Sequence, residues 1–352
     1  LTNKCMKEDV DGYAIMANKE CSARFESEIY DRQIRLWGAD AQAKISKARI
    51  LYVNLTGVCQ EILKNLVLAG VRATLCDTRP YPDAVQTTAS FFLLDRNDIT
   101  NKKPKYASVG HAMQGAVEEL NPLLGKCDVI EKSVTELDMS IVKEYDMVVA
   151  SRLSIDDAGR LAAATTQTGG KFYLVDCFGY NGASLFDLGP DHSYRTELGK
   201  NKISKDLYNL ETYVPLKDIW NIPLSGLTGK RVDKHHPPMI YMQYRAIMEY
   251  NAKTKKWPSY SSTDEFEKVV REWMKTTSSS VNKYISKELL HDWARTATAE
   301  VSPVCAVVGG IIGNEIIKAI SSKGEPANNC IIFDGQTGKC RNVLLQHSKK
   351  NG

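Results

Sequence analysis

The apolar residues before position 180 form short continuous runs that alternate with segments of helical spacing. The short runs predict strands at residues 50–53, 73–77, 128–134, 146–150 and 171–177. Apolar residues three or four positions apart predict helices at residues 24–46 with a break at Gly38, and at 61–69, 105–120 and 155–168. Strands that alternate with helices pair into a mostly parallel sheet with helices on both faces. We therefore predict a Rossmann-like α/β fold.

The pattern changes after residue 177. Residues 181–188 fit a short antiparallel strand, and the chain from there to about residue 280 is rich in Lys, Asp, Pro and Tyr. Only two amphipathic helices are predicted between residues 189 and 300, at residues 265–275 and 286–295. We therefore expect a smaller domain inserted into the first one.

The C-terminal part returns to an apolar pattern. Residues 303–320 predict a very apolar helix, which we expect to be too short and too rich in glycine to span a bilayer. We expect this helix to lie in the core and partly at an interface. Residues 329–334 and 341–345 predict a hairpin. The predicted organisation is a flexible N-terminus at 1–24, a Rossmann-like domain at 25–180, an inserted smaller domain at 181–300, and a return to the first domain at 301–352.

The composition excludes several classes of protein. The 352 residues are 43% hydrophobic and 25% charged, and the net charge of +4 is too small to indicate binding to nucleic acid or to a membrane. The nine cysteines are scattered, with no Cys-x-x-Cys pair and no cluster with histidine, so we predict no metal site. The first twenty residues lack the apolar core of a signal sequence. We expect a reducing compartment, the nucleus or the cytoplasm.

A strand, a tight turn and a helix at residues 50–70 have the order of a nucleotide-binding motif, but the turn has few glycines. A phosphate at a helix N-terminus needs positions without Cβ, so that backbone N–H groups can approach it. Asn54, Thr56 and Cys59 place side chains where a glycine-rich loop would leave space, and only Gly57 remains. The pattern predicts a nucleotide-binding fold whose own pocket no longer binds nucleotide.

Three segments resemble the ubiquitin-like modifier activating enzymes. They are YDRQIRLWG at residues 30–38, EILKNLVLAGV at 61–71, and PVCAVVGG at 303–310, the last followed by Asn328-Asn329 and by FDG at 333–335. The first run is highly specific. The C-terminal run and the chain length favour the branch that activates SUMO. The resemblance covers residues 25–180 and 300–345, and residues 190–300 match poorly.

This resemblance implies an adenylation fold of the ThiF and MoeB type that works as the smaller half of a heterodimer. The larger subunit of such a pair binds ATP and Mg²⁺, carries the cysteine that takes SUMO as a thioester, and holds a structural zinc. The smaller subunit is then regulatory and non-catalytic, and no cofactor is expected in this chain.

Comparison with active members of the family supports the loss of the pocket. Asp77 is followed by Arg79 where a second acid is expected, and residues 86–90 read QTTAS in place of an Asn/Arg/Gln stretch. Ser154-Ile155 replaces an Asp-Asn pair, and Lys105 alone matches the family's lysine. A single lysine cannot rebuild a site for a triphosphate and a metal ion.

The resemblance also assigns a role to Arg32. In the family, the arginine at this position reaches into the partner's ATP site and contacts the γ-phosphate, as an arginine finger acting in trans. Without the resemblance, Arg32 would be an exposed helix arginine paired with Glu28 or Asp31. Arg35, one turn further on, is either a second phosphate contact or a member of a salt bridge.

Other reactive residue types have simpler interpretations. Cys305 lies in an apolar helix without a nearby cation, and Cys177 lies beside Asp176, so we predict that neither thiol is catalytic. His235-His236 precedes two prolines and is interpreted as loop surface rather than as a metal site.

Two alternatives remain open on the sequence alone. The first is a self-sufficient homodimeric adenylyltransferase of the ThiF and MoeB type, or a dinucleotide enzyme, which would bind nucleotide without a partner. The second is a pure scaffold, which would need its dimer surface but not Arg32.

Overall fold

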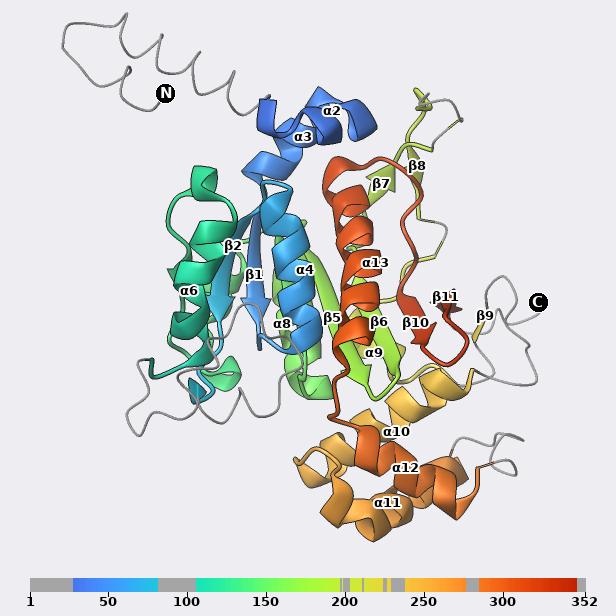
Figure 1. Ribbon diagram of the computed structural model, residues 1–352. Coiled ribbons are helices and arrows are strands. Elements are labelled where there is room, and N and C mark those ends of the chain that lie inside the picture. The colour runs from blue at the N-terminus through green and yellow to red at the C-terminus, as the bar shows by residue number, and fades with distance from the viewer. Residues whose placement is uncertain are drawn as a thin grey trace, which may run out of the picture.

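The computed structural model describes residues 28–81, 106–196, 198, 203–210, 212–223, 227–228, 238–276 and 285–346. In these residues a nine-stranded sheet runs through the molecule, with helices packed on both of its faces (Figure 1). The predicted Rossmann-like α/β fold is confirmed.

The sheet has a parallel half and an antiparallel half. The parallel half has the strand order β3-β2-β1-β4-β5, and the antiparallel half continues as β6-β10-β11-β9. The strands are β1 (Arg49–Val53), β2 (Arg72–Cys76), β3 (Asp128–Val129), β4 (Met147–Ala150), β5 (Lys171–Phe178), β6 (Asn181–Asp187), β9 (Leu227–Thr228), β10 (Cys330–Asp334) and β11 (Lys339–Leu345), with β7 (Ser193–Tyr194) and β8 (Tyr208–Asn209) pairing apart from them.

Alternate residues of each strand point into two separate cores. The helices are α2 (Asp31–Trp37), α3 (Ala39–Lys47), α4 (Gly57–Leu68), α6 (Val109–Leu120), α7 (Met139–Val142), α8 (Ile155–Thr166), α9 (Leu216–Ile219), α10 (Met239–Thr254), α11 (Thr263–Thr276), α12 (Lys287–Thr296) and α13 (Ser302–Ser321). In β1, Ile50 and Tyr52 pack under α4, α6 and α13. Leu51 and Val53 pack on the other face, with α8 and α10. This alternation follows from the two-residue period of a strand that is buried on both sides.

The helix predicted before the first strand is broken at Gly38, as expected. Gly38 has φ 86, a conformation that glycine adopts without strain, and it separates α2 from α3. The two helices lie beyond the amino ends of the parallel strands, at the top of Figure 1.

Helix α13 packs directly against α4, and a glycine permits the close approach. A Cβ atom at Gly309 would lie 2.6 Å from the Cβ of Glu61. At 20 residues, α13 is long and apolar enough to cross a membrane, so the expectation that it is too short is wrong. Because 56% of the apolar window is buried inside the protein, packing against α4 and against the sheet accounts for its composition.

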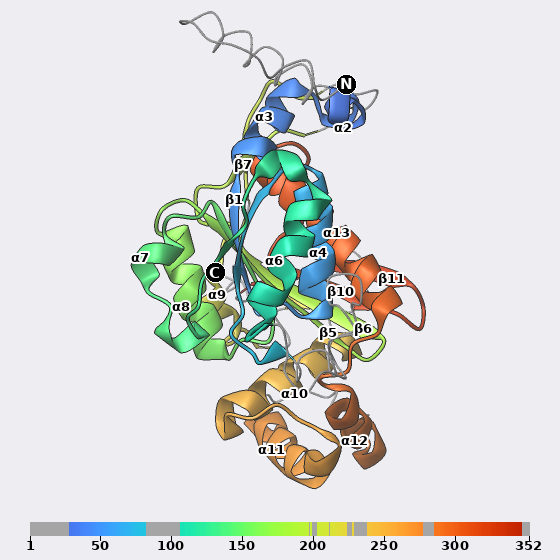
Figure 2. The same ribbon diagram turned by 60° about the vertical axis from the view of Figure 1, so that its left-hand side comes forward.

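The inserted region is helical, and its boundary differs from the predicted one. Strand β6 pairs with β5 and β10, so it belongs to the main sheet rather than to a domain that begins at residue 181. Helix α10 packs against β6 and β10, while α11 and α12 pack on each other beyond the carboxyl ends of the parallel strands (Figures 1 and 2).

Two predicted elements have other bounds in the structure. Only Asp128–Val129 of the strand expected at residues 128–134 pairs with a neighbour. The chain then forms a 3-10 turn at Val134–Glu136, because the Ser133 and Glu136 side chains cap it. Helix α4 begins at Gly57, four residues before the predicted start.

Candidate functional site

The carboxyl ends of β1 and β4 mark the place where a doubly wound sheet normally binds its ligand. The strand order reverses between these two neighbours, and such switch points open a crevice in which nucleotides are held. In this chain the turn from β1 into α4 lies at that point. The residues of the turn therefore decide whether the crevice is open.

Side chains of the chain itself bridge the crevice. Nδ2 of Asn54 donates to the carbonyl oxygen of Ser151 at 2.9 Å, and Oγ1 of Thr56 donates to Oγ of Ser151 at 2.8 Å. Asn54 has φ 59, a left-handed conformation that asparagine adopts more readily than most residues with a side chain. The ends of β1 and β4 are thus tied together where a phosphate loop would leave space.

The N-terminus of α4 is capped by the carboxylate of Glu300, the residue that precedes α13 by two positions. The backbone N–H of Gly57 donates to Oε2 of Glu300 at 2.8 Å, and that of Val58 donates to Oε1 at 3.4 Å. A helix N-terminus attracts anions because its first N–H groups are unpaired and its dipole is positive there. The carboxylate of Glu300 therefore holds the position that a phosphate would need.

Asp77, just after β2, is engaged on both of its carboxylate oxygens. Nε of Arg79 donates to Oδ1 at 2.9 Å, and the backbone N–H of Leu55 donates to Oδ2 at 2.7 Å. In doubly wound folds an acid at this position binds the hydroxyls of a nucleotide ribose. Burial lowers the pKa of Arg79, but the hydrogen bond to Asp77 raises this pKa by more, so the net shift is upward and the guanidinium stays charged. Neither oxygen of Asp77 is free for a ribose.

A second buried acid closes the crevice on the β4–β5 side. Oδ1 of Asp176 accepts hydrogen bonds from Oγ of Ser151 at 2.9 Å and from the backbone N–H of Arg152 at 2.8 Å, and Oδ2 accepts one from the Tyr244 hydroxyl at 2.9 Å. The guanidinium of Arg152 also donates to the carbonyl oxygens of Ala297 and Cys177. Arg152 is thus held by two separate segments, β5 and the residue that follows α12, at the carboxyl ends of the strands.

Two thiols near the crevice, those of Cys59 and Cys177, are buried and have raised pKa values. Burial raises the pKa of Cys59 well above its usual value, with a further contribution from the Asp77 carboxylate. A hydrogen bond with Cys305 and burial raise the pKa of Cys177. A protonated thiol is a poor nucleophile. The raised pKa supports the expectation that Cys177 is not catalytic. Cys305 is buried in α13, and the expectation for its thiol remains a prediction.

Some predicted positions cannot be placed. Lys105, the QTTAS stretch at residues 86–90 and His235-His236 lie outside the described residues. The predictions for these residues remain predictions.

The YDRQIRLWG run has two anchored residues and an exposed surface between them. The Tyr30 ring is buried, and its hydroxyl accepts a hydrogen bond from Nδ2 of Asn121 at 2.8 Å. Nε1 of Trp37 donates to Oε1 of Gln42 at 3.0 Å, and Nζ of Lys323 donates to the carbonyl oxygen of Trp37. The helix between these anchors buries none of its own residues.

Arg32 and its neighbours point into solvent from this helix. Arg32 is exposed and makes no hydrogen bond or ion pair within the described residues, whereas Arg35 pairs with Asp31 at 3.0 Å. Leu36 and Ile29, four positions after and three before Arg32, are 73% and 49% exposed. An arginine flanked by exposed apolar side chains on an anchored helix is suited to contact with another molecule.

Arg32 lies at the far end of the sheet from its own crevice. Nε2 of Gln33 donates to the carbonyl oxygen of Leu68, the last residue of α4, whereas Glu300 contacts Gly57, the first. Helix α4 has 12 residues, so its ends lie about 18 Å apart. Figure 1 shows α2 above the end of α4 that is opposite to the crevice. In this conformation Arg32 cannot contact a nucleotide at the carboxyl ends of its own strands.

Sequence reasoning did not identify Glu300 or Arg152 as crevice residues. Glu300 is 243 positions from the N–H group that it caps, and Arg152 contacts a carbonyl 145 positions away. The loss of glycines in the turn indicated that the pocket had changed. It gave no sign of which residues had filled it.

Comparisons with known proteins agree with this architecture. The family model described as the ThiF family matches residues 30–352. The chain therefore belongs to the ThiF family.

Within that family it is similar over nearly its whole length to proteins named SUMO-activating enzyme subunit 1. It is 31% identical to the one from Dictyostelium discoideum over 89% of this chain and 92% of that protein. The Xenopus tropicalis protein is 29% identical, over 92% and 97%, and the Homo sapiens protein is 28% identical, over 89% and 93%.

Proposed function

We propose that this chain is the regulatory, non-catalytic subunit of a SUMO-activating enzyme. It pairs with a larger subunit, which binds ATP and Mg²⁺ and adenylates the C-terminus of SUMO. This chain stabilises the pair and lends Arg32 to the partner's ATP site. The observation that carries the proposal is the contrast between a crevice filled by its own residues and an exposed arginine at the opposite end of the sheet.

The filled crevice supports a non-catalytic role. A nucleotide would have to displace Glu300 from the start of α4, break the Asp77–Arg79 pair and separate Asn54 from Ser151. Each of these contacts is buried or partly buried, and breaking it leaves an uncompensated donor or charge. ATP binding by this chain alone is therefore disfavoured.

The position of Arg32 supports action in trans. Its guanidinium has a permanent charge and a planar fork of donors, which match the oxygens of a phosphate. Because it lies about 18 Å or more from its own crevice, the phosphate that it serves must belong to another chain. Adenylation breaks the bond between the α- and β-phosphates. A contact to the γ-phosphate would then act mainly on ATP binding and on the geometry of the leaving pyrophosphate.

The exposed side of α13 supports pairing. Helix α13 leaves Ala306, Val307 and Gly310 exposed along one side, level with the first half of α4, where Gly309 packs on Glu61. A Cβ atom at Gly310 would meet nothing within 4 Å. This small, apolar strip would let a helix of the larger subunit approach closely.

The experiment is ATP–pyrophosphate exchange with purified chains, in the presence of SUMO. We expect no exchange and no calorimetric ATP binding with this chain alone, and exchange only after the larger subunit is added. Tight ATP binding by the single chain would contradict the proposal and would favour a self-sufficient adenylyltransferase.

A further inference from the structure

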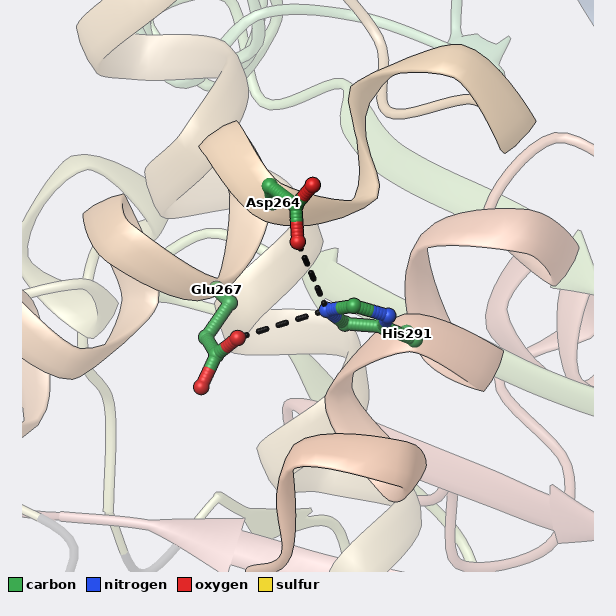
Figure 3. Close-up of side chains that lie close together, drawn as sticks. All are labelled: Asp264, Glu267 and His291. Atoms are coloured by element: carbon green, nitrogen blue, oxygen red, sulfur yellow. Dashed lines mark hydrogen bonds and ion pairs between the residues drawn. The ribbon is translucent and has the colours of Figure 1, made fainter.

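Helices α11 and α12 bring together three side chains that have no part in the proposed function. Asp264 and Glu267 lie one turn apart at the start of α11, and His291 lies in the middle of α12. Figure 3 shows both carboxylates directed at the same ring nitrogen. One potential ligand atom from each residue lies within 4.8 Å of the other two.

The distances in this cluster suit a small divalent ion. Nε2 of His291 is 3.5 Å from Oδ1 of Asp264 and 3.3 Å from Oε2 of Glu267. A tetrahedral zinc ion with bonds of about 2.1 Å needs ligand atoms about 3.4 Å apart. The two carboxylate oxygens lie within 4.8 Å of each other. The Asp264 side chain is 85% exposed, so it can move to bring its oxygen to the separation that zinc needs.

Two neighbouring basic side chains contact the ligands: Arg271 orients Glu267, and Lys287 lies between the two carboxylates. Nε of Arg271 donates to Oε1 of Glu267 at 2.9 Å, which leaves Oε2 directed at His291. Nζ of Lys287 lies 3.6 Å from a carboxylate oxygen of both Asp264 and Glu267. Its ammonium group therefore occupies the position between the two acids that a metal ion would take. Its side chain is 56% exposed and can swing into solvent.

We propose that Asp264, Glu267 and His291 form a binding site for a divalent ion of the zinc class. Zinc binds imidazole nitrogen together with carboxylate oxygen, and three protein ligands leave the fourth position to water. Magnesium and calcium prefer all-oxygen sites, so the histidine disfavours them. The ion displaces the Lys287 ammonium and the proton on Nε2 of His291.

The bound ion links α11 to α12 and so stabilises the inserted helical region. Its ligands come from two helices that are joined by a connection between residues 276 and 287. An ion that binds only the folded arrangement raises the stability of that arrangement. This site is separate from the crevice and from α2, so the test of metal binding does not depend on the proposed function.

The test is a titration of the full chain with Zn²⁺ and, separately, with Co²⁺, followed by calorimetry and by visible absorption. We expect saturable binding of one ion per chain, a rise in the melting temperature, and a cobalt spectrum of nitrogen and oxygen ligands without the thiolate band that cysteines would give. His291→Gln and Asp264→Asn should each weaken binding by about tenfold or more.

Two further variants distinguish a specific metal site from a simple ion-pair cluster. His111 pairs with Glu131 at 3.0 Å, and its Nδ1 lies 2.9 Å from Oγ of Ser108. His111→Gln therefore removes a histidine that has one carboxylate partner among the described residues, and it should leave zinc binding unchanged. Lys287→Met removes the competing ammonium and should tighten binding several-fold. Zinc binding that His291→Gln does not weaken, or its absence from both the wild-type chain and the Lys287→Met variant, would overturn the proposal.

Discussion

The two ends of the parallel sheet differ in how their charged side chains are satisfied. At the carboxyl ends, Glu300, Asp77 and Asp176 all have partners from the same chain. At the amino ends, helix α2 presents Arg32 without a partner in the described residues, beside the exposed side chain of Leu36. The end that holds the ligand in this fold is closed, and the other end has the properties of a contact surface. This difference supports the proposal that the chain keeps the framework of the fold while the chemistry takes place on a partner molecule.

This contrast predicts that substitutions at the closed end act on stability. The largest effect is expected for Asp176→Ala, because it leaves Ser151, Arg152 and Tyr244 without their buried acceptor. Breaking a buried charged network of this kind destabilises a protein by about 3–5 kcal/mol. Urea unfolding of the isolated chain measures it. A loss below about 1 kcal/mol would show that the network does not hold the closed end together.

Glu300→Ala should have a smaller effect of the same kind. It removes the carboxylate that caps α4, and the loss of a helix N-cap costs about 1–2 kcal/mol. Glu300→Gln keeps an acceptor oxygen without the charge and should recover part of the loss. Equal unfolding midpoints for all three chains would contradict the role given to this carboxylate.

Substitutions at the exposed end should weaken binding to the larger subunit and leave the stability of the single chain nearly unchanged. Leu36→Ser removes an apolar side chain that is 73% exposed, so the unfolding free energy of the single chain should change by less than about 0.5 kcal/mol. Binding to the larger subunit should weaken, and calorimetry of the pair measures this. Asp40→Ser, an exposed change at the start of α3, is the control. If Leu36→Ser left the affinity unchanged, α2 would not lie at the interface.

The sequence predicted the framework well because the information for it is local. The apolar runs before residue 180 gave the strand and helix order, and Gly38 gave the break between α2 and α3. The sequence did not predict α10, since this helix is buried on most of its circumference and carries polar residues such as Gln243, Arg245 and Asn251 inside. Such a helix has no polar face, and periodicity alone cannot detect it.

The sequence directed attention to the crevice and to Arg32, and the roles assigned to these residues remain predictions. The missing glycines around Asn54 and Thr56 indicated a changed pocket, because the conformation and space of a turn depend on its own residues. The residues that fill the crevice come from distant segments, and only the folded chain brings Glu300 to Gly57. The same holds for Asp264 and His291, whose 27-residue separation matches no metal-binding motif.

The most direct test of the central claim is a comparison of arginine variants in the reconstituted pair. Arg32→Ala should lower ATP–pyrophosphate exchange by about tenfold or more. We expect this loss to be smaller than the loss seen with arginine fingers that act on the transferred phosphate. Arg32→Lys, which keeps the charge but loses the planar fork, should give an intermediate rate. Arg72→Ala, another exposed arginine at the amino end of the sheet, should change little. The account predicts this order with the pair intact by size-exclusion chromatography, and full exchange by the Arg32→Ala pair would contradict it.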